Sequence, residues 1–400
     1  MAGRRIPEMS PPLNPLLIDT ATPPIPEARA WIGRYSGACG ALIDLSQAAP
    51  AVAPSSEMLE RLAAAARDPA SARYGAIEGD AELRAAYAAD VAAVYGATDL
   101  GIDSVAITAG CNQAFVVVAM SIAKAGDAII LPSPWYFNHK MALDMHGVET
   151  RPLACEASNG FSPDPARAEA MIDARTRAIV LVTPNNPTGA VYSPETIAAF
   201  AKLCRARGLW LILDETYRDF MPDGADRPHH LLASPETRAN IAQLYSFSKS
   251  HAIPGYRLGA VLGPPPLMRQ IAKCLDTLQI CPARVGQSST AWAMDAQRGW
   301  REGNRADINR RASAFSAAMT EAEGWRIDSV GAYFAFVRHP FAAIPAARVA
   351  ERLATERGVL ALPGSWFGPG CENHLRVAFA NASLEQLERL PTRLAGLQIA

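Results

Sequence analysis

Residues 246–259 read Ser-Phe-Ser-Lys-Ser-His-Ala-Ile-Pro-Gly-Tyr-Arg-Leu-Gly, and they continue an apolar run that predicts a strand. Lysine is rare in this chain, with five residues against 33 arginines (38 minus 5), and Lys249 is the lysine that follows such a strand. A poorly solvated lysine loses proton affinity and becomes a nucleophile toward aldehydes. Ser246, Ser248 and Arg257 would add hydroxyl donors and a fixed cation, which suit a phosphate dianion. The stretch therefore predicts a reactive amine beside a phosphate site.

Six short apolar runs of the middle of the chain predict strands. Amphipathic or alanine-rich stretches between them, such as 110–124 and 193–207, predict helices. Apolar strands that alternate with helices predict a mostly parallel sheet covered on both faces. A later block, about 290–400, combines a long helical stretch with strand-like runs at 332–338 and 374–380 and a helix near 345–357, which predicts an α+β domain. The six runs are 104–108, 128–132, 177–183, 208–213, 240–246 and 259–263.

Length and composition narrow the class of protein. A chain of 400 residues, half of them hydrophobic, suits two domains that share a site. A net charge of −1 without basic patches argues against nucleic acid and anionic membranes as partners. Seven cysteines without a CxxC pair indicate reduced thiols in a cytoplasmic protein and predict no metal site. His229 and His230 lie among Pro, Asp and Gly, which predicts a surface loop.

The N-terminal residues 1–30 contain many prolines and no long apolar run, so we expect neither a signal peptide nor a membrane span there. We expect this segment to be an extended arm that lies over its own domain or over a partner subunit.

Five segments with polar or small residues directly follow predicted strands. Ligands of open α/β sheets bind beyond the carboxyl ends of the strands, so these segments should meet at one rim. A single lysine after a strand is usually structural, and it is this convergence that favours a chemical role. The segments are 108–110, 132–136, 183–189, 214–217 and 246–249.

Residues 246–259 fit every restricted position of the lysine signature of the class I/II aminotransferases, which are pyridoxal-phosphate (PLP) enzymes of fold type I in the aspartate aminotransferase superfamily. The chain resembles this family over roughly 43–380. The resemblance implies an α/β fold whose large domain has a mostly parallel, seven-stranded type of sheet covered by helices, plus a smaller α+β domain built from both termini. We expect residues 1–49 to form the N-terminal arm and part of the small domain, 50–290 the large PLP-binding domain and 291–400 the small C-terminal domain.

The resemblance implies pyridoxal 5′-phosphate as cofactor, carried by Lys249 as a Schiff base. Asp214 matches the carboxylate that pairs with the pyridine nitrogen, with a helix N-cap as the plain alternative. Tyr217 and Asn186 match the groups that hydrogen-bond the phenolic oxygen, and Asn186 would also contact the substrate. Tyr136 matches the aromatic that stacks on the cofactor ring, although Trp135 could stack there or line the substrate pocket instead.

At the phosphate end, Gly110 permits close backbone approach where a helix begins, and helix-start amides bind phosphate. Cys111 stands where family members often have a hydroxyl or small residue, so one donor is missing, and we expect Asn112 to contact the cofactor too. Tyr74 matches the tyrosine that reaches the cofactor phosphate of the neighbouring subunit. The resemblance therefore implies a homodimer with shared active sites.

At the substrate end, Arg376 matches the arginine that clamps the α-carboxylate. An arginine that alternates with apolar residues on a strand is costly to bury unpaired, so it should meet an anion. Ala48 stands where the family usually keeps a glycine beside the substrate, and it would narrow the pocket. Arg284 is the candidate cation for a distal carboxylate, but it could equally be a surface residue at the dimer interface.

These patterns predict an aminotransferase that acts on amino acids and 2-oxo acids in a ping-pong reaction. Aromatic residues near the rim (Trp135, Tyr136, Tyr333 and Trp366) favour aromatic or other uncharged side chains, and an aspartate-specific enzyme is less favoured. A carbon–sulfur β-lyase or an enzyme resembling aminocyclopropane-carboxylate synthase stays open, because the same residues begin those reactions.

Overall fold

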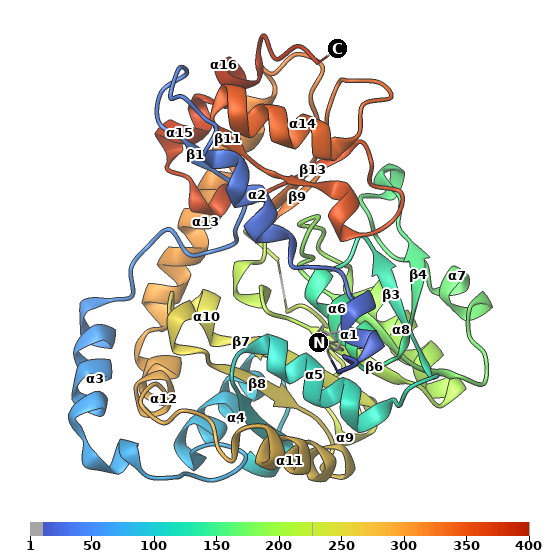
Figure 1. The fold of residues 1–400 in the computed structure, drawn as a ribbon. Helices are drawn as coiled ribbons and strands as arrows, with labels where there is room; N and C mark the ends of the chain where they lie inside the picture. Colours follow the sequence, from blue (N-terminus) through green and yellow to red (C-terminus); the bar gives the residue numbers. More distant parts are fainter. Residues whose placement is uncertain (1–10, 226, 400) are drawn as a thin grey trace, which may run out of the picture.

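The computed structural model describes residues 11–225 and 227–399. A seven-stranded sheet lies at the centre of the larger part of the molecule (Figure 1). The antiparallel strand β8 pairs with β2 and β7, and the other pairs are parallel, as expected. In spatial order the strands are β2 (Val105–Thr108), β8 (Gly259–Leu262), β7 (Ile241–Ser246), β6 (Trp210–Asp214), β5 (Thr176–Val182), β3 (Ala128–Ser133) and β4 (Glu149–Ala154).

Helices cover both faces of this sheet. Ile179 and Leu181 of β5 pack into one hydrophobic layer with α4, α8 and α12, while Ala178 and Val180 pack into the other with α5, α6 and α11. Side chains alternate across a strand, so a run that is apolar at every position supplies both layers. The helices of this part are α3 (Ser56–Arg67), α4 (Ala81–Tyr95), α5 (Cys111–Ile122), α6 (Phe137–Met145), α7 (Pro165–Ala170), α8 (Pro194–Arg207), α9 (Pro235–Arg238), α10 (Phe247–Ser250), α11 (Pro265–Gln279) and α12 (Gln287–Ala296).

A smaller α+β part combines both ends of the chain. Strand β1 (Ile43–Asp44) pairs in parallel with β11 (Val359–Leu360), and α2 packs beside β11, so that blue and red segments meet in Figure 1. The second sheet has the order β12 (Leu362–Pro363), β13 (His374–Val377), β10 (Phe334–Arg338) and β9 (Arg326–Gly331). Its helices are α13 (Arg298–Met319), α14 (Ala346–Arg352), α15 (Leu384–Glu388) and α16 (Leu390–Leu394). This is the α+β arrangement expected from both termini.

The N-terminal segment was expected to be extended, and this is wrong for the helical part of the described residues, whereas a contact with its own domain agrees with the expectation. Helix α1 (Pro15–Asp19) packs against α6, and α2 (Pro24–Ile32) follows it. Proline is tolerated in the first turn of a helix, because the N–H that it lacks has no intrahelical partner there. The prolines therefore mark helix starts rather than extended chain. Residues 1–10 lie outside the described part.

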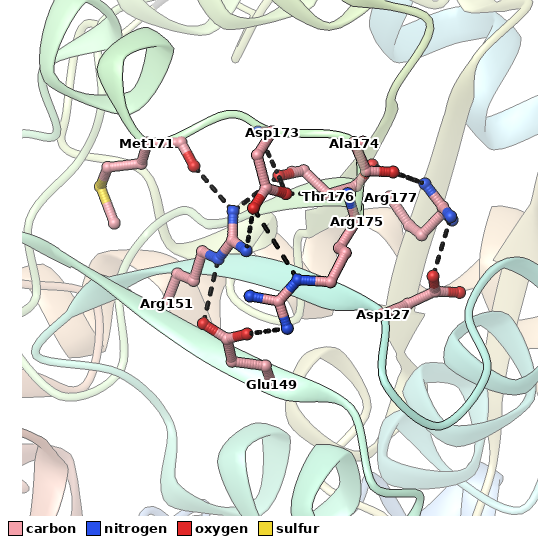
Figure 2. A network of polar contacts seen from close by, with 9 residues as sticks. All are labelled: Asp127, Glu149, Arg151, Met171, Asp173, Ala174, Arg175, Thr176 and Arg177. Atoms are coloured by element: carbon pink, nitrogen blue, oxygen red, sulfur yellow. Dashed lines mark hydrogen bonds and ion pairs between the residues drawn. The ribbon is translucent and has the colours of Figure 1, made fainter.

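Edge strand β4 was not predicted, because its sequence Glu-Thr-Arg-Pro-Leu-Ala is polar and contains a proline. Arg151 binds it to the loop that leads into β5 (Figure 2). Its guanidinium donates to Glu149 Oε1 (3.1 Å), Asp173 Oδ2 (2.7 Å), the Met171 carbonyl (2.8 Å) and Thr176 Oγ1 (3.0 Å). Side-chain contacts with the loop thus supplement the backbone pairing of β4 with β3.

Short 3₁₀ or π turns connect the larger elements. They are η1 (Pro69–Ala72), η2 (Ile102–Ser104), η3 (Ala157–Asn159), η4 (Arg218–Phe220), η5 (Pro254–Tyr256), η6 (Leu353–Arg357), η7 (Gly364–Phe367) and η8 (Phe379–Asn381). Within residues 11–225 and 227–399, no helix has the length and apolar character needed to cross a bilayer. The seven cysteines are all free.

Candidate active site

A cavity of about 480 Å³ lies at the carboxyl ends of the large sheet's strands, where the smaller part meets it. Twelve of the residues predicted to bind the cofactor or the substrate line it, whereas Gly110, Trp135 and Tyr74 do not, nor do the further candidates Arg284, Tyr333 and Trp366. The predicted residues that line it are Ala48, Cys111, Asn112, Tyr136, Asn186, Asp214, Tyr217, Ser246, Ser248, Lys249, Arg257 and Arg376. The segments that follow the strands therefore converge, together with Arg376 from β13.

Lys249 lies in α10, the short helix that begins where β7 ends. Its ammonium nitrogen, Nζ, donates to the backbone carbonyl of Ala48. Burial, together with the positive charges of Arg257 and Arg376, lowers the pKa of Lys249 to about 8. The uncharged form of this amine, which a nucleophile or a base requires, is therefore much more populated near neutral pH than in an ordinary lysine.

Asp214 ends β6, and its carboxylate is buried at the cavity. Oδ1 accepts from the Thr216 backbone N–H (3.0 Å), and Oδ2 lies 3.2 Å from His139 Nε2. Burial alone would raise the pKa of Asp214, but the hydrogen bond and charge of His139 and the bonds from Thr216 hold the pKa below its usual value. Asp214 therefore keeps a negative charge facing the cavity. It caps no helix, because the next helical turn, η4, has Tyr217 at its N-cap.

His139 is a residue that the sequence analysis missed. It lies on α6, its ring stacks on Phe115 with centroids 4.0 Å apart, and it is almost fully buried. A histidine one helical turn after Tyr136 was the only available signal, since the pairing with Asp214 joins segments that are distant in sequence. The structure thus adds a positioning partner to the predicted carboxylate.

Close backbone packing shapes the end of the cavity near Arg257. Helix α5 begins after Gly110, whose φ is +84°, and a Cβ at Gly110 would lie 2.3 Å from Arg257 Nη2. A Cβ at Gly259 would likewise lie 2.6 Å from the carbonyl carbon of Gly110. Glycine at position 110 therefore lets the Arg257 guanidinium reach the start of α5. Glycine at position 259 lets β8 pack against the backbone of Gly110.

The groups at this end fit a phosphate ester. Arg257 donates to the carbonyls of Pro254 (3.0 Å) and Ala109 (3.3 Å), and it forms no ion pair with any residue in the described ranges. The Ser248 hydroxyl is buried and has no hydrogen-bond partner there. A free cation, an unpaired hydroxyl and the first amides of a twelve-residue helix together form an anion site.

Arg376 is buried on β13, between the rings of Phe334 and Phe367, whose centroids lie 5.2 and 5.0 Å from its guanidinium carbon. It donates to Asn186 Oδ1 (3.3 Å) and to the carbonyl of Ser46. Burial lowers its pKa to about 10. No acidic side chain within 11–225 and 227–399 pairs with it, so the cavity holds a buried cation that lacks an anion.

Some predicted residues lie elsewhere. Tyr74 is 78% exposed and does not line the cavity of its own chain. Trp135 is turned toward Gly368, where a Cβ would lie 3.3 Å from the indole ring. Arg284 pairs with Asp80, with 3.2 Å between Nε and Oδ1.

Two of the aromatic residues that were predicted near the rim also lie elsewhere. Tyr333 is fully buried against Phe220, with centroids 4.8 Å apart, and Trp366 packs on Trp31 at 5.6 Å, so that neither lines the cavity. Lining residues that sequence reasoning missed are Pro23, Ile25, Gln47, Phe137, Asn138, Val182, Thr216 and Pro254. Phe137 and Asn138 are the two residues after Tyr136, and Thr216 lies between Asp214 and Tyr217, but the N-terminal segment offered no signal.

The expectation of a surface loop at His229 and His230 is wrong for His229, although His230 is exposed. His229 is fully buried, and its Nε2 lies 3.0 Å from Oε1 of Glu215. Glu215 follows Asp214 and extends to the opposite face of the sheet, where Tyr95 also donates to it (2.6 Å). Successive residues of a strand point to opposite faces, so the two neighbouring carboxylates each meet a different histidine.

The family model described as aminotransferase class I and II matches residues 41–394. The chain belongs to this family. It is 27% identical to an aromatic aminotransferase of Arabidopsis thaliana, over 85% of this chain and 86% of that protein. It is 32% identical to an arginine–pyruvate transaminase of Pseudomonas aeruginosa, over 69% and 70%. The solved aspartate aminotransferase of Thermus thermophilus with maleate superposes with a TM-score of 0.87 at 25% identity, covering 96% of this chain and 99% of that one.

Class I and II aminotransferases depend on pyridoxal phosphate, and this aminotransferase is therefore a PLP-dependent transferase of amino groups. The residues present fit the cofactor: the cavity has an amine of lowered pKa, a buried carboxylate and an anion site with an unpaired hydroxyl.

Proposed function

We propose that this aminotransferase moves the amino group of an L-amino acid with an aromatic or other uncharged side chain to a 2-oxo acid, in a ping-pong reaction. The supporting observation is the set of cations at the cavity. Among the described residues, Lys249, Arg257 and Arg376 are the basic side chains that line it. With Lys249 assigned to chemistry and Arg257 to phosphate, Arg376 serves the α-carboxylate, and no lining cation of the same chain is left for a distal carboxylate.

The proposed roles toward the cofactor follow from the two ends of the cavity. Arg257, Ser246, Ser248 and the first amides of α5, with Cys111 and Asn112, would hold the phosphate. When bound, pyridoxal phosphate supplies an aldehyde for the substrate amine and a pyridinium ring that accepts an electron pair. Asp214, oriented by His139, would keep a proton on the ring nitrogen.

Three further residues would position the cofactor ring and the substrate. Tyr136 would stack on the ring, since it lines the cavity and its hydroxyl accepts from Asn138 Nδ2 (2.8 Å). Tyr217 and Asn186 would donate to the phenolic oxygen. Asn186 also contacts Arg376, so it would connect cofactor binding with carboxylate binding.

In the proposed reaction, the Arg376 guanidinium holds the substrate α-carboxylate in place of the anion that the free protein lacks. The uncharged Lys249 amine would take the proton from the substrate Cα and would hold it for return to the bound cofactor. Ala48 accepts a hydrogen bond from Lys249 through its carbonyl and would limit the pocket on that side. Pro23, Ile25 and Phe137 would contact an apolar substrate side chain.

We also propose that the enzyme is a homodimer in which Tyr74 reaches the cofactor phosphate of the partner subunit. Tyr74 is exposed although it is aromatic, and its place outside the cavity of its own chain agrees with a role across an interface. Arg284 lies beside the segment that contains Tyr74, since a Cβ at Gly75 would be 3.2 Å from Arg284 Cδ, and it pairs with Asp80. The names of the relatives leave the assembly open, so this part of the proposal depends on Tyr74.

A kinetic panel tests the substrate class. We expect phenylalanine, tyrosine, tryptophan, methionine or glutamine to exceed aspartate in kcat/KM by roughly tenfold or more, because a buried carboxylate without a partner is costly. Return of the amino group to a second 2-oxo acid distinguishes transfer from carbon–sulfur lysis. A clear preference for aspartate, lost selectively in Arg284→Ala, would contradict the proposal and make Arg284 the second clamp.

A further inference from the structure

A second cavity, of about 330 Å³, lies between α4, η4 and α13, and none of its lining residues lines the first cavity. Its described lining contains five arginines against three acidic residues. The arginines are Arg218, Arg227, Arg298, Arg301 and Arg305, and the acidic residues are Asp90, Asp219 and Glu302. A concave surface with an excess of guanidinium groups attracts anions.

The two most buried arginines share two carboxylates, so the excess positive charge of the lining lies on the other three arginines. Arg218 pairs with Asp90, and Arg301 pairs with Asp90 and with Asp219, at 3.1 Å in both cases. The same carboxylate thus serves two guanidinium groups. The side chains of Arg218 and Arg301 are 3% and 10% exposed, so water reaches few of the N–H donors that the two carboxylates leave unpaired.

Each of three arginines that line this cavity keeps a buried donor without a partner. These donors are Arg218 Nη1, Arg301 Nε and Arg305 Nε, and none finds an acceptor among the described residues. Buried N–H groups of charged side chains are normally hydrogen-bonded, and exceptions call for an absent acceptor. The planar guanidinium group matches a carboxylate or a phosphate in geometry.

The remaining lining distinguishes between these two anions. Ala93, Val94, Met221, Ala225 and Pro228 give the cavity an apolar part next to the arginines. An inorganic oxyanion would leave that part in contact with water, whereas a carboxylate with a short hydrocarbon body would cover it. We propose that this cavity is a second ligand site, which binds a small organic carboxylate through Arg218, Arg301 and Arg305.

The test must separate this site from the first cavity, where carboxylates are also expected to bind. The Arg376→Ala variant, loaded with pyridoxal phosphate, removes the carboxylate partner of the first cavity. Titration calorimetry with 4-methylpentanoate is then expected to show one remaining site per chain. Adding Arg305→Ala should weaken this binding about tenfold or more, the usual loss for a charge-assisted hydrogen bond.

Arg310→Ala is the matched control, because Arg310 lies on the same helix, is 66% exposed, pairs with Asp307 and does not line the cavity. It should leave the Kd within about twofold, since exposed ion pairs contribute little. Ala93→Glu provides a second variant: position 93 is exposed on α4, and the added carboxylate should occupy the arginines and block binding while Tm stays the same or rises.

Inorganic phosphate provides the second arm of the titration, and it should bind about tenfold more weakly than 4-methylpentanoate because it leaves the apolar part uncovered. The proposal is overturned if the Arg376→Ala protein binds no 4-methylpentanoate, or if Arg305→Ala and Arg310→Ala have equal effects. Phosphate binding as tight as that of the organic acid would overturn the choice of ligand. None of these outcomes depends on the proposed amino-acid substrate.

Discussion

At the scale of single residues, the feature with the most direct consequence is the crowding of three cations around one cavity. Lys249 is the only one of them that can lose its proton in the ordinary pH range, and burial together with the charges of Arg257 and Arg376 favours that loss. The arrangement supplies an uncharged amine without a neighbouring general base.

Amine labelling at varied pH tests this consequence. In the cofactor-free protein, the rate at which trinitrobenzenesulfonate modifies Lys249 should rise with pH through a midpoint of about 8. The sign follows from the lowered pKa, since only the uncharged amine reacts, and its fraction grows as pH passes the pKa. Exposed lysines should show a midpoint near their ordinary pKa of about 10.4. Peptide mass spectrometry measures each lysine separately.

Arg257→Gln is the informative comparison, because it removes one positive charge and should move the Lys249 midpoint upward. A midpoint shared with Lys124, Lys140, Lys202 and Lys273 would show that the environment does not activate Lys249.

The residues that sequence analysis could find are those that carry local signals. Lys249 and Arg257 lie in one continuous signature, and Asp214 directly follows an apolar strand. His139 and His229 were missed as partners because each meets its carboxylate across a long sequence separation. The position of Trp135 also depends on packing against a distant loop. The roles assigned to all these residues stay predictions.

At the scale of elements, side-chain contacts bind the edge strand β4 to the loop before β5. Arg151 is 11% exposed and contacts four residues, three of which lie in the loop before β5 or at its start (Figure 2). Arg175, in the same loop, reaches Glu149 from the other side (2.7 Å) but is 55% exposed.

Arg151→Ala should lower the free energy of unfolding by about 1–3 kcal/mol, because the Met171 carbonyl and the hydroxyl of the buried Thr176 lose their charged donor. Urea denaturation measures this change. The control Arg175→Ala should cost less than about 1 kcal/mol, as exposed ion pairs do. Both variants should keep the kcat/KM of the wild type, since neither residue lines the cavity. Equal losses of stability in the two variants would contradict the structural role of Arg151.

The strands of the large sheet that were predicted correctly are those buried on both faces. Six of the seven strands of the large sheet are mostly apolar, and this pattern can be recognised from the sequence of each strand alone. Strand β4 has only one buried residue, Leu153, and α1 has none, so their formation depends on contacts that a local pattern does not contain.

At the scale of the whole molecule, the resemblance to class I and II aminotransferases anticipated the two-part α/β architecture, because its motifs extend along most of the chain. The boundaries near residues 49 and 290 stay predictions, as does the dimer.

Mixed dimers test the proposed sharing of active sites. Lys249→Ala and Tyr74→Phe subunits should each be strongly impaired alone, and mixing them should restore part of the activity. Each mixed dimer then has one cavity with both Lys249 and the partner's Tyr74 intact. Activity of reassociated mixtures, compared with each variant alone, provides the measurement. Full activity from a species that sediments as a monomer would rule out shared sites.

The parallel pairing of β1 with β11 also has a consequence for how the protein is made. The chain is synthesised from its N-terminus. Ile43 of β1, together with Pro23 and Ile25 of the cavity wall, therefore leaves the ribosome long before Val359 and Arg376. All strands of the large sheet lie within 105–262 and can assemble during translation. The cavity wall, however, needs Pro23 and Ile25 as well as Arg376, so the binding site is complete only after residue 376 has been synthesised.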